Sequence, residues 1–190
     1  MSKDRKQIIL QSLAKLLEER DATKVTTASL AKESGITEAA LYRHFPSKRS
    51  IFLELFSFCD ETIFKKVGEI KKESTIEPYE KIRLIFFFFI IFLEKNKGFA
   101  RILSREALGP NEKNVIDAVN QFYERLELSM KQILASEKER IQLTPGISSH
   151  LITSTMEGII SRFIRNGFKE MPSGYIENYW SLLSRSLFKN

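Results

Sequence analysis

The sequence predicts an all-α protein in two parts: an N-terminal three-helix helix-turn-helix module in residues 1–49, and a C-terminal helical dimerisation domain in residues 50–190. Apolar residues recur at helical spacing along the chain, and no stretch shows the sustained alternation typical of a strand. Near the amino end, two short helical segments flank a glycine-containing turn, the outline of a helix-turn-helix. The length of 190 residues is enough for a small module on a larger core.

A first helix is predicted over about residues 4–20, and polar residues 21–24 end it. Thr26 is a good N-cap for the second helix, because its hydroxyl can accept a hydrogen bond from a free backbone N–H. That helix ends at Gly35, where the chain can leave through a left-handed conformation. Ile36 is expected to be the apolar side chain that the turn buries.

Thr37 is predicted to cap the third helix, with Leu41 and Phe45 four residues apart on its inner face. Pro46 ends this helix and Ser47 caps the next. The outward side carries small residues first and hydrogen-bonding residues later, which is typical of a helix that enters the major groove of DNA. These residues are Thr37, Ala39, Ala40, Tyr42, Arg43 and His44. On pattern alone, an ordinary αα-hairpin with a solvated outer face stays open.

Charge favours the same interpretation. Residues 1–50 hold ten Lys and Arg against six Asp and Glu, which places +4 of the net charge of +6 in about a quarter of the chain. Such an asymmetry suits a polyanionic partner, although a basic but inert surface is equally compatible with it. Lys48 opens a helix, where a cation opposes the helix dipole, so an external anion such as phosphate explains its position better.

The second part begins with a long helix over about residues 50–72, whose buried stripe leaves Phe58 and Phe64 to either side. Pro78 opens a central helix. Its unbroken apolar run, residues 84–93, is half of the ~20 residues that a membrane span needs. We expect it to be fully buried, and membrane contact is the less favoured alternative. The predicted buried stripe of the long helix is Phe52, Leu55, Phe56, Cys59, Ile63, Val67 and Ile70.

Later elements follow from turn signals and spacing. Residues 96–98 are expected to break the central helix, and Gly109-Pro110 is expected to form a turn. Helices are predicted over about 99–108, 115–141, 147–168 and 176–188. The last two carry apolar residues with small residues between them, which predicts a two-fold interface of four helices. Alternatively, these helices only cap their own core.

Nothing in the sequence supports a catalytic residue, a metal site or a cofactor. The two histidines are His44, in the predicted recognition helix, and His150, near a helix start. Cys59 is the only cysteine, which excludes an intrachain disulfide and fits a reducing cytoplasm. The polar amino end shows no signal peptide, and a glycine-rich phosphate loop is absent. The chain is therefore not expected to be an enzyme.

The segment TTASLAKESGITEAALYRHFPSK, residues 26–48, resembles the DNA-binding motif of the TetR family, T-x-x-x-[LI]-A-x-x-x-G-[VI]-[ST]-x-x-x-[LI]-Y-x-[HY]-F-x-[ST]-K. Every fixed position of that pattern is met. The resemblance implies a homodimer that binds double-stranded DNA. The residues that would hold DNA are Thr26, Thr27, Thr37, Ala39, Tyr42, Arg43, His44 and Lys48.

Within that family, stretches such as EGIISRFIRNGFK, residues 157–169, are similar to nucleoid occlusion factors along nearly the whole chain. This resemblance implies a nucleoid-associated protein that binds FtsZ and blocks Z-ring assembly over the chromosome. Phe58, Lys66, Lys95 and Asn96 would hold FtsZ. Ile91 stands where a glycine is usual, which leaves the detail of that surface open. A ligand-responsive repressor, the commoner type in the family, is the alternative.

Overall fold

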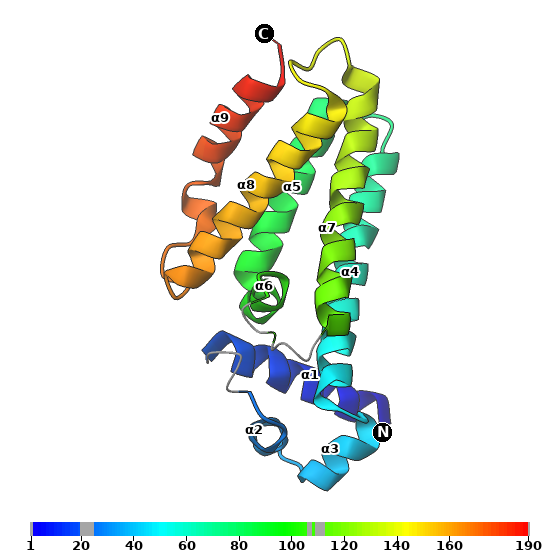
Figure 1. The fold of residues 1–190 in the computed structure, drawn as a ribbon, viewed down its shortest axis with the longest axis vertical. Coiled ribbons are helices and arrows are strands. Elements are labelled where there is room, and N and C mark those ends of the chain that lie inside the picture. Colours follow the sequence, from blue (N-terminus) through cyan, green and yellow to red (C-terminus); the bar gives the residue numbers. More distant parts are fainter. Residues whose placement is uncertain (1, 20–24, 106–107, 109–112, 190) are drawn as a thin grey trace. The chain divides into compact units, whose positions relative to one another are not determined.

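The computed structural model describes residues 2–19, 25–105, 108 and 113–189, and these residues are almost entirely helical (Figure 1). The elements are α1 (Ser2–Glu19), α2 (Thr27–Glu33), α3 (Glu38–His44), α4 (Lys48–Lys72), α5 (Pro78–Lys95), α6 (Lys97–Leu103), α7 (Lys113–Leu134), the 3-10 turn η2 (Ala135–Glu137), α8 (Pro145–Arg165), the 3-10 turn η3 (Pro172–Gly174) and α9 (Ile176–Leu187). The predicted all-α class is confirmed. The expected end of the first helix at 20–24 and the Gly109-Pro110 turn lie outside the described residues.

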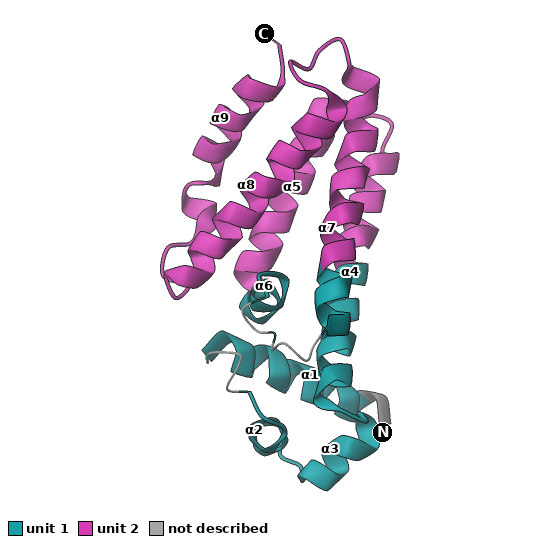
Figure 2. Ribbon diagram, viewed as in Figure 1, with its two compact units in different colours: residues 1–61, 96–119 teal, residues 62–95, 120–190 magenta. Residues whose placement is uncertain are grey.

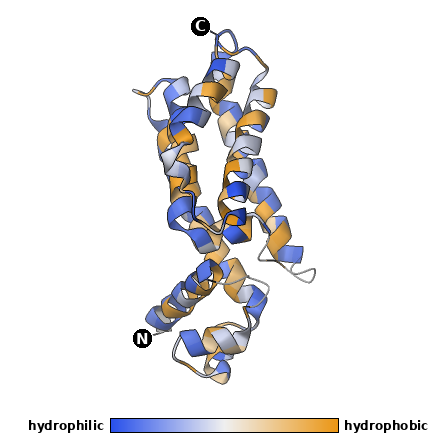
Figure 3. Cartoon of the chain, turned by 90° about the vertical axis from the view of Figure 1, so that its left-hand side faces the viewer, coloured by the Kyte–Doolittle hydropathy of each residue, from blue (hydrophilic) through white to orange (hydrophobic). Residues whose placement is uncertain are grey.

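Contacts divide the chain into two compact units, one of residues 1–61 and 96–119 and the other of residues 62–95 and 120–190 (Figure 2). Hydrophilic and hydrophobic residues share most helices (Figure 3), as expected where one side of each helix is buried. The predicted boundary at residue 49 between a DNA-binding domain and a partner-binding domain stays a prediction.

In the first unit, α1 packs against both α2 and α6. The approach of α6 to α1 is so close that a Cβ at Gly98 would lie 2.5 Å from the carbonyl oxygen of Ala14. The expected break at residues 96–98 is therefore wrong in part. Only Asn96 lies between α5 and α6, and Gly98 is a helical residue that the packing of α6 on α1 requires.

In the second unit, α5 runs beside α8 (Figure 1). The core of this unit contains phenylalanines that are fully buried, and the rings of Phe89 and Phe122 lie 6.0 Å apart. Phe64 packs edge-on against Phe122 at 5.3 Å, and the Arg125 guanidinium lies 3.8 Å from the Phe64 ring centre. Every residue of the predicted α4 stripe is buried.

The expectation of a fully buried central helix is wrong in part. One side of α5 is buried, including Phe86 and Phe89, but Leu84, Phe88 and Phe92 are half-buried. An uninterrupted apolar run places apolar side chains on every side of a helix. The described helices of this unit pack against only part of α5, so some of these side chains stay partly exposed. The half-buried residues at four-residue spacing therefore form a second, partly open apolar face.

The α8 helix ends earlier than predicted, at Arg165. The N–H of Gly167 donates to the Ile164 carbonyl and the N–H of Phe168 donates to the Phe163 carbonyl, both at 2.9 Å. Gly167 has φ +69°, and the rings of Phe163 and Phe168 lie 4.9 Å apart. This is a Schellman ending with its hydrophobic contact, and it turns the chain out of the helix.

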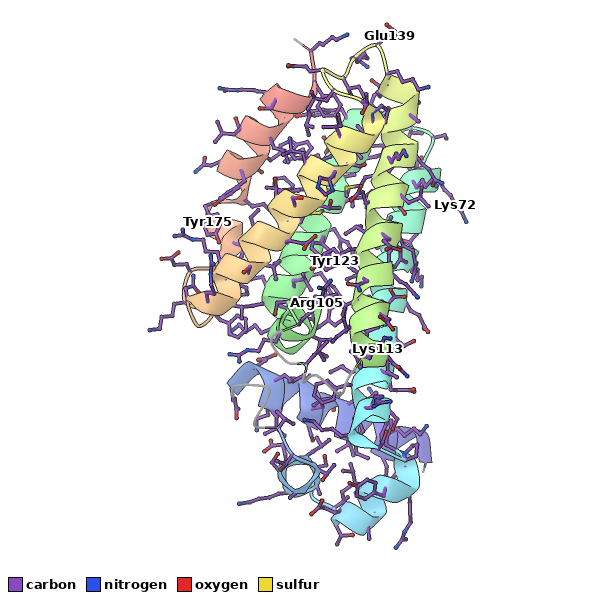
Figure 4. The ribbon with its side chains drawn as sticks, viewed as in Figure 1. Lys72, Arg105, Lys113, Tyr123, Glu139 and Tyr175 are labelled. Carbon is purple, nitrogen blue, oxygen red and sulfur yellow. The ribbon has the colours of Figure 1, made fainter. Side chains whose placement is uncertain are left out.

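The last described residues are held against the loop that precedes α8. Ile141 and Phe188 form an isolated antiparallel bridge, in which the N–H of Gln142 donates to the Leu187 carbonyl at 2.8 Å. The Lys189 ammonium donates to the carbonyl of Glu139, labelled in Figure 4, at 2.9 Å. The predicted helix through residue 141 ends at Leu134, and this loop takes its place.

Candidate nucleic-acid interface

The α2 helix begins and ends with complete capping motifs. The Thr26 hydroxyl accepts from the Ser29 N–H at 3.1 Å, and the Ser29 hydroxyl accepts from the Thr26 N–H at 3.0 Å. At the other end, Gly35 has φ +65° and the Ile36 N–H donates to the Ala31 carbonyl at 3.0 Å. The predicted cap and left-handed glycine are confirmed. Ile36 itself is half-buried instead of fully buried, because the turn lies at the surface.

The α3 helix is anchored by its inner face. The Thr37 hydroxyl accepts from the Ala40 N–H at 3.2 Å, which confirms the predicted cap. Leu41 and Phe45 are buried, as predicted, and the Lys6 ammonium lies 5.2 Å from the centre of the Phe45 ring. A short helix held by its N-terminal cap and by two buried side chains keeps its other face exposed.

The start of α4 repeats the capping arrangement. The Ser47 hydroxyl accepts from the Ser50 N–H at 3.1 Å, and the Ser50 hydroxyl accepts from the Ser47 N–H at 3.2 Å. Lys48 follows, half-buried, with its ammonium 5.3 Å from the centre of the Phe52 ring. This cation–π contact gives Lys48 a partner within the chain and fixes where its charge lies.

Most residues predicted to hold DNA lie on the exposed side of α2 and α3. Thr26, Thr37, Ala39 and Arg43 are exposed, and Tyr42 is 48% exposed. The other three, Thr27, His44 and Lys48, are half-buried. The geometry thus brings small residues and hydrogen-bonding residues to one surface of a capped helix.

An ion pair joins α2 to α1, and a hydrogen bond joins α2 to α3. Lys15 on α1 contacts Glu33 on α2 at 2.7 Å, and this hydrogen bond raises the pKa of the Lys15 ammonium. The Thr27 hydroxyl donates to Oε2 of Glu38 at 2.7 Å and joins the first turn of α2 to the first turn of α3. Glu38 was not singled out from the sequence, because small residues and hydrogen-bond donors were sought on this helix and a carboxylate is an acceptor.

The residues predicted to hold FtsZ are divided between the two units. Phe58 in the first unit is 66% exposed, and Asn96 is the half-buried residue before α6. In the second unit Lys95 is exposed, and Lys66 pairs with Glu69 at 3.3 Å. Their role in binding stays a prediction.

Lys66 also lines a hollow of about 400 Å³ between the end of α4 and the start of α5. Ile70, Leu84 and Phe88 give this hollow apolar walls, and Glu73 adds a carboxylate at its edge. Sequence reasoning missed Leu84 and Phe88 because it treated their run as fully buried. No polar residue interrupts that run, so its periodicity does not mark which side is open.

Other expectations concern metal sites, membrane spans and the second histidine. Among the described residues, no group of three or more His, Cys, Asp or Glu side chains is placed to hold a metal ion. No helix in the described part of the chain is long and apolar enough to cross a membrane. His150 is an exposed residue whose Nδ1 lies 3.3 Å from Oε2 of Glu127.

Comparison with known proteins extends these observations to the whole chain. Residues 9–55 match the family model of the bacterial regulatory proteins of the tetR family, and residues 76–188 match that of the SlmA-like, tetracyclin repressor-like C-terminal domain. The first is a family of regulatory proteins, in agreement with the prediction that the chain is not an enzyme.

Curated relatives match over nearly their full length. The nucleoid occlusion factor SlmA of Vibrio cholerae serotype O1 is 38% identical, over 97% of this chain and 96% of the relative. SlmA of Sodalis glossinidius is 35% identical over the same shares.

Solved structures share the fold at low identity. The repressor NalD of the MexAB-OprM multidrug efflux pump in Pseudomonas aeruginosa has a TM-score of 0.77, with 17% identity and complete coverage of both chains. The fatty acid degradation regulator FadR of Bacillus halodurans has a TM-score of 0.80, with 16% identity over 94% of each chain. With both family models and the full-length relatives in agreement, the chain belongs to the SlmA branch of the TetR family.

Proposed function

We propose that this protein is a nucleoid occlusion factor. It is a cytoplasmic, nucleoid-associated homodimer that binds specific sites on double-stranded DNA through α2 and α3, and it then binds FtsZ and inhibits Z-ring assembly over the chromosome. The observation that carries this proposal is that similarity to curated nucleoid occlusion factors covers 97% of the chain, well beyond the shared helix-turn-helix.

DNA binding is supported by the capped helices and their exposed face. Ala39 is small enough for close approach to base edges, while Tyr42 and Arg43 can donate hydrogen bonds. Lys48 places a cation at the start of α4, near the end of α3. In this proposal α3 lies in the major groove, and Lys48 and His44 contact phosphates.

Dimerisation is supported by apolar residues that α8 and α9 leave uncovered. Ile147 is 56% exposed on α8 and Leu182 is 68% exposed on α9. Exposed Ser154 and Gly158 lie on the same side of α8 as Ile147 and allow a second helix to approach closely. Pairing of these faces in two copies would bury them, and the dimer would carry two α3 helices, one for each half-site of a near-palindrome.

FtsZ binding is supported by the hollow in the second unit. Its apolar walls, Leu84 and Phe88, suit apolar side chains of a partner segment, and the Lys66 ammonium suits a carboxylate beside them. Lys95 lies two turns after Phe88 on the same side of α5 and adds a second cation. Phe58, exposed on α4, is a further aromatic anchor in this proposal.

A mixing experiment tests the proposal. FtsZ polymers assembled with GTP are followed by light scattering and sedimentation, with and without the protein bound to a duplex selected for affinity. We expect the DNA-bound protein to bind FtsZ and to reduce or alter its polymers. The Lys66→Glu variant should lose this effect, whereas Lys65→Glu, which makes the same charge change at an exposed neighbour outside the hollow, should keep it.

The opposite result has a clear meaning. If DNA-bound protein neither binds FtsZ nor alters its polymers, nucleoid occlusion is refuted. A ligand-responsive repressor then becomes the better explanation, and release of DNA by small apolar molecules is the measurement that follows.

A further inference from the structure

We infer that Glu38 reads a base in the major groove and that Thr27 is the positioning residue that holds its carboxylate in place. The inference rests on the proposed binding of DNA through α3. Glu38 is the first residue of α3 and is exposed. In a helix-turn-helix, residues at the N-terminal end of the recognition helix are the ones that reach base edges.

The hydrogen bond between the two residues fixes the geometry of the carboxylate. The Thr27 hydroxyl donates to Oε2 of Glu38 at 2.7 Å, across the turn that separates α2 from α3. A hydroxyl carries a single proton, so Thr27 cannot also donate to a DNA phosphate. Oε1 of Glu38 accepts no hydrogen bond from the described part of the chain, and it is therefore available to accept one from outside.

The chemistry of a carboxylate limits which bases it can read. An ionised carboxylate only accepts hydrogen bonds. In the major groove, cytosine N4 and adenine N6 are donors, whereas guanine O6 and N7 and thymine O4 are acceptors that would repel it. Glu38 therefore selects a cytosine or an adenine at one position of each half-site.

The negative charge has a second effect. Glu38 lies one turn before Tyr42 on the exposed side of α3, and it would stand close to the phosphates of any bound duplex. Its repulsion lowers affinity for all sequences, and only a matched base amino group compensates for it. Discrimination then comes from a penalty against wrong sequences as well as from a bond to the right one.

A purely structural role predicts something different. If the Thr27–Glu38 bond only braces α2 against α3, its loss would lower stability and weaken binding to every duplex by the same factor. A base-reading role changes the order of preference among duplexes. Base preference, measured apart from overall affinity, distinguishes the two roles.

The test begins with wild-type protein and a randomised duplex library. The tightest duplex is kept, and each base pair of its half-site is replaced in turn by the other three. Kd values are measured by fluorescence anisotropy at fixed salt for wild type, Glu38→Ala, Thr27→Val, Thr27→Ser and Glu54→Gln. Glu54 is an exposed carboxylate on α4, and its replacement is the control for the removal of one negative charge.

Wild type should prefer cytosine or adenine at one position by at least tenfold, which is about 1.4 kcal/mol. Glu38→Ala should lose that preference at this position alone, while affinity for mismatched duplexes stays equal or rises. Thr27→Val should reduce the preference severalfold, Thr27→Ser should restore it because its hydroxyl still donates, and Glu54→Gln should keep it.

Two results would overturn the inference. If Glu38→Ala keeps the wild-type preference at every position, Glu38 does not read a base, even though DNA binding stands. If wild type binds no duplex, the proposed function fails and the inference fails with it.

Discussion

Replacing Gly98 by alanine should destabilise the protein, although alanine is the better helix former. A Cβ at this position would lie 2.5 Å from the Ala14 carbonyl oxygen, 3.1 Å from its Cα and 3.2 Å from its carbonyl carbon. All three are backbone atoms of α1, so no flexible side chain can move aside. Real Cβ atoms essentially never come within 3.0 Å of a non-bonded heavy atom from another segment, so α6 and α1 must separate by at least the remaining 0.5 Å.

The magnitude follows from two opposing effects. Overpacking of this kind costs about 1–3 kcal/mol. Alanine in place of glycine returns at most ~1 kcal/mol in a helix interior, and less here because Gly98 is the second residue of α6. We expect a net loss of about 1–2 kcal/mol, which for a chain of this size lowers the Tm by roughly 2–8 °C.

Thermal and urea unfolding followed by circular dichroism measure this loss, at one fixed protein concentration because dimerisation would make the Tm concentration-dependent. Gly68→Ala is the matched control. Apart from its chain neighbours and the backbone of its own helix, no heavy atom of the described residues lies within 4 Å of a Cβ at Gly68. The position stands inside α4, so this substitution should raise stability by up to ~1 kcal/mol. If Gly98→Ala unfolds at or above the wild-type temperature, the close approach of α6 to α1 does not constrain this position.

Three further predictions concern binding, assembly and the thiol. Arg43→Ala and Lys48→Ala should each weaken DNA binding and reduce the slope of log K against log salt by about 0.9 for every phosphate that the variant no longer neutralises; unchanged affinity and slope in both variants would refute these roles. Leu182→Glu should shift the protein from dimer to monomer in sedimentation velocity, because a carboxylate would be buried in the proposed interface, and a dimer of wild-type strength would place the interface elsewhere. Burial raises the pKa of the Cys59 thiol to about 12, so native protein should resist a thiol reagent at pH 8 that modifies the unfolded chain at once. As pH rises from about 9 towards 12, the thiol ionises in the unfolded chain but not in the folded protein. The free energy of unfolding of wild type should therefore fall by up to about 1.4 kcal/mol per pH unit through this group. The Cys59→Ala variant lacks the thiol and should not show this contribution.

Local signals in the sequence predicted local structure well. The caps at Thr26 and Thr37 depend on residues three positions away, and the left-handed Gly35 depends on its own missing side chain. The buried stripe of α4 was predictable because its apolar residues recur every three or four positions. This spacing marks the side of the helix that faces the core.

Features that depend on distant residues could not be predicted in this way. Gly98 was interpreted as a helix breaker, because its reason for being glycine is the backbone of Ala14 on another helix. The half-buried Leu84 and Phe88 lie in a run without polar residues, so periodicity could not tell the covered side of α5 from the open one. Glu38 was missed because its partner, Thr27, lies across a turn.

The anchoring of the last described residues has a practical consequence for work in cells. The Gln142 N–H bonds to the Leu187 carbonyl, and the Lys189 N–H bonds to the Arg140 carbonyl, both at 2.8 Å. A fluorescent reporter joined directly after this stretch would pull on the connection between α7 and α8, whereas a glycine-serine spacer would leave it undisturbed. Imaging with short and long spacers should therefore precede any conclusion about where the protein gathers.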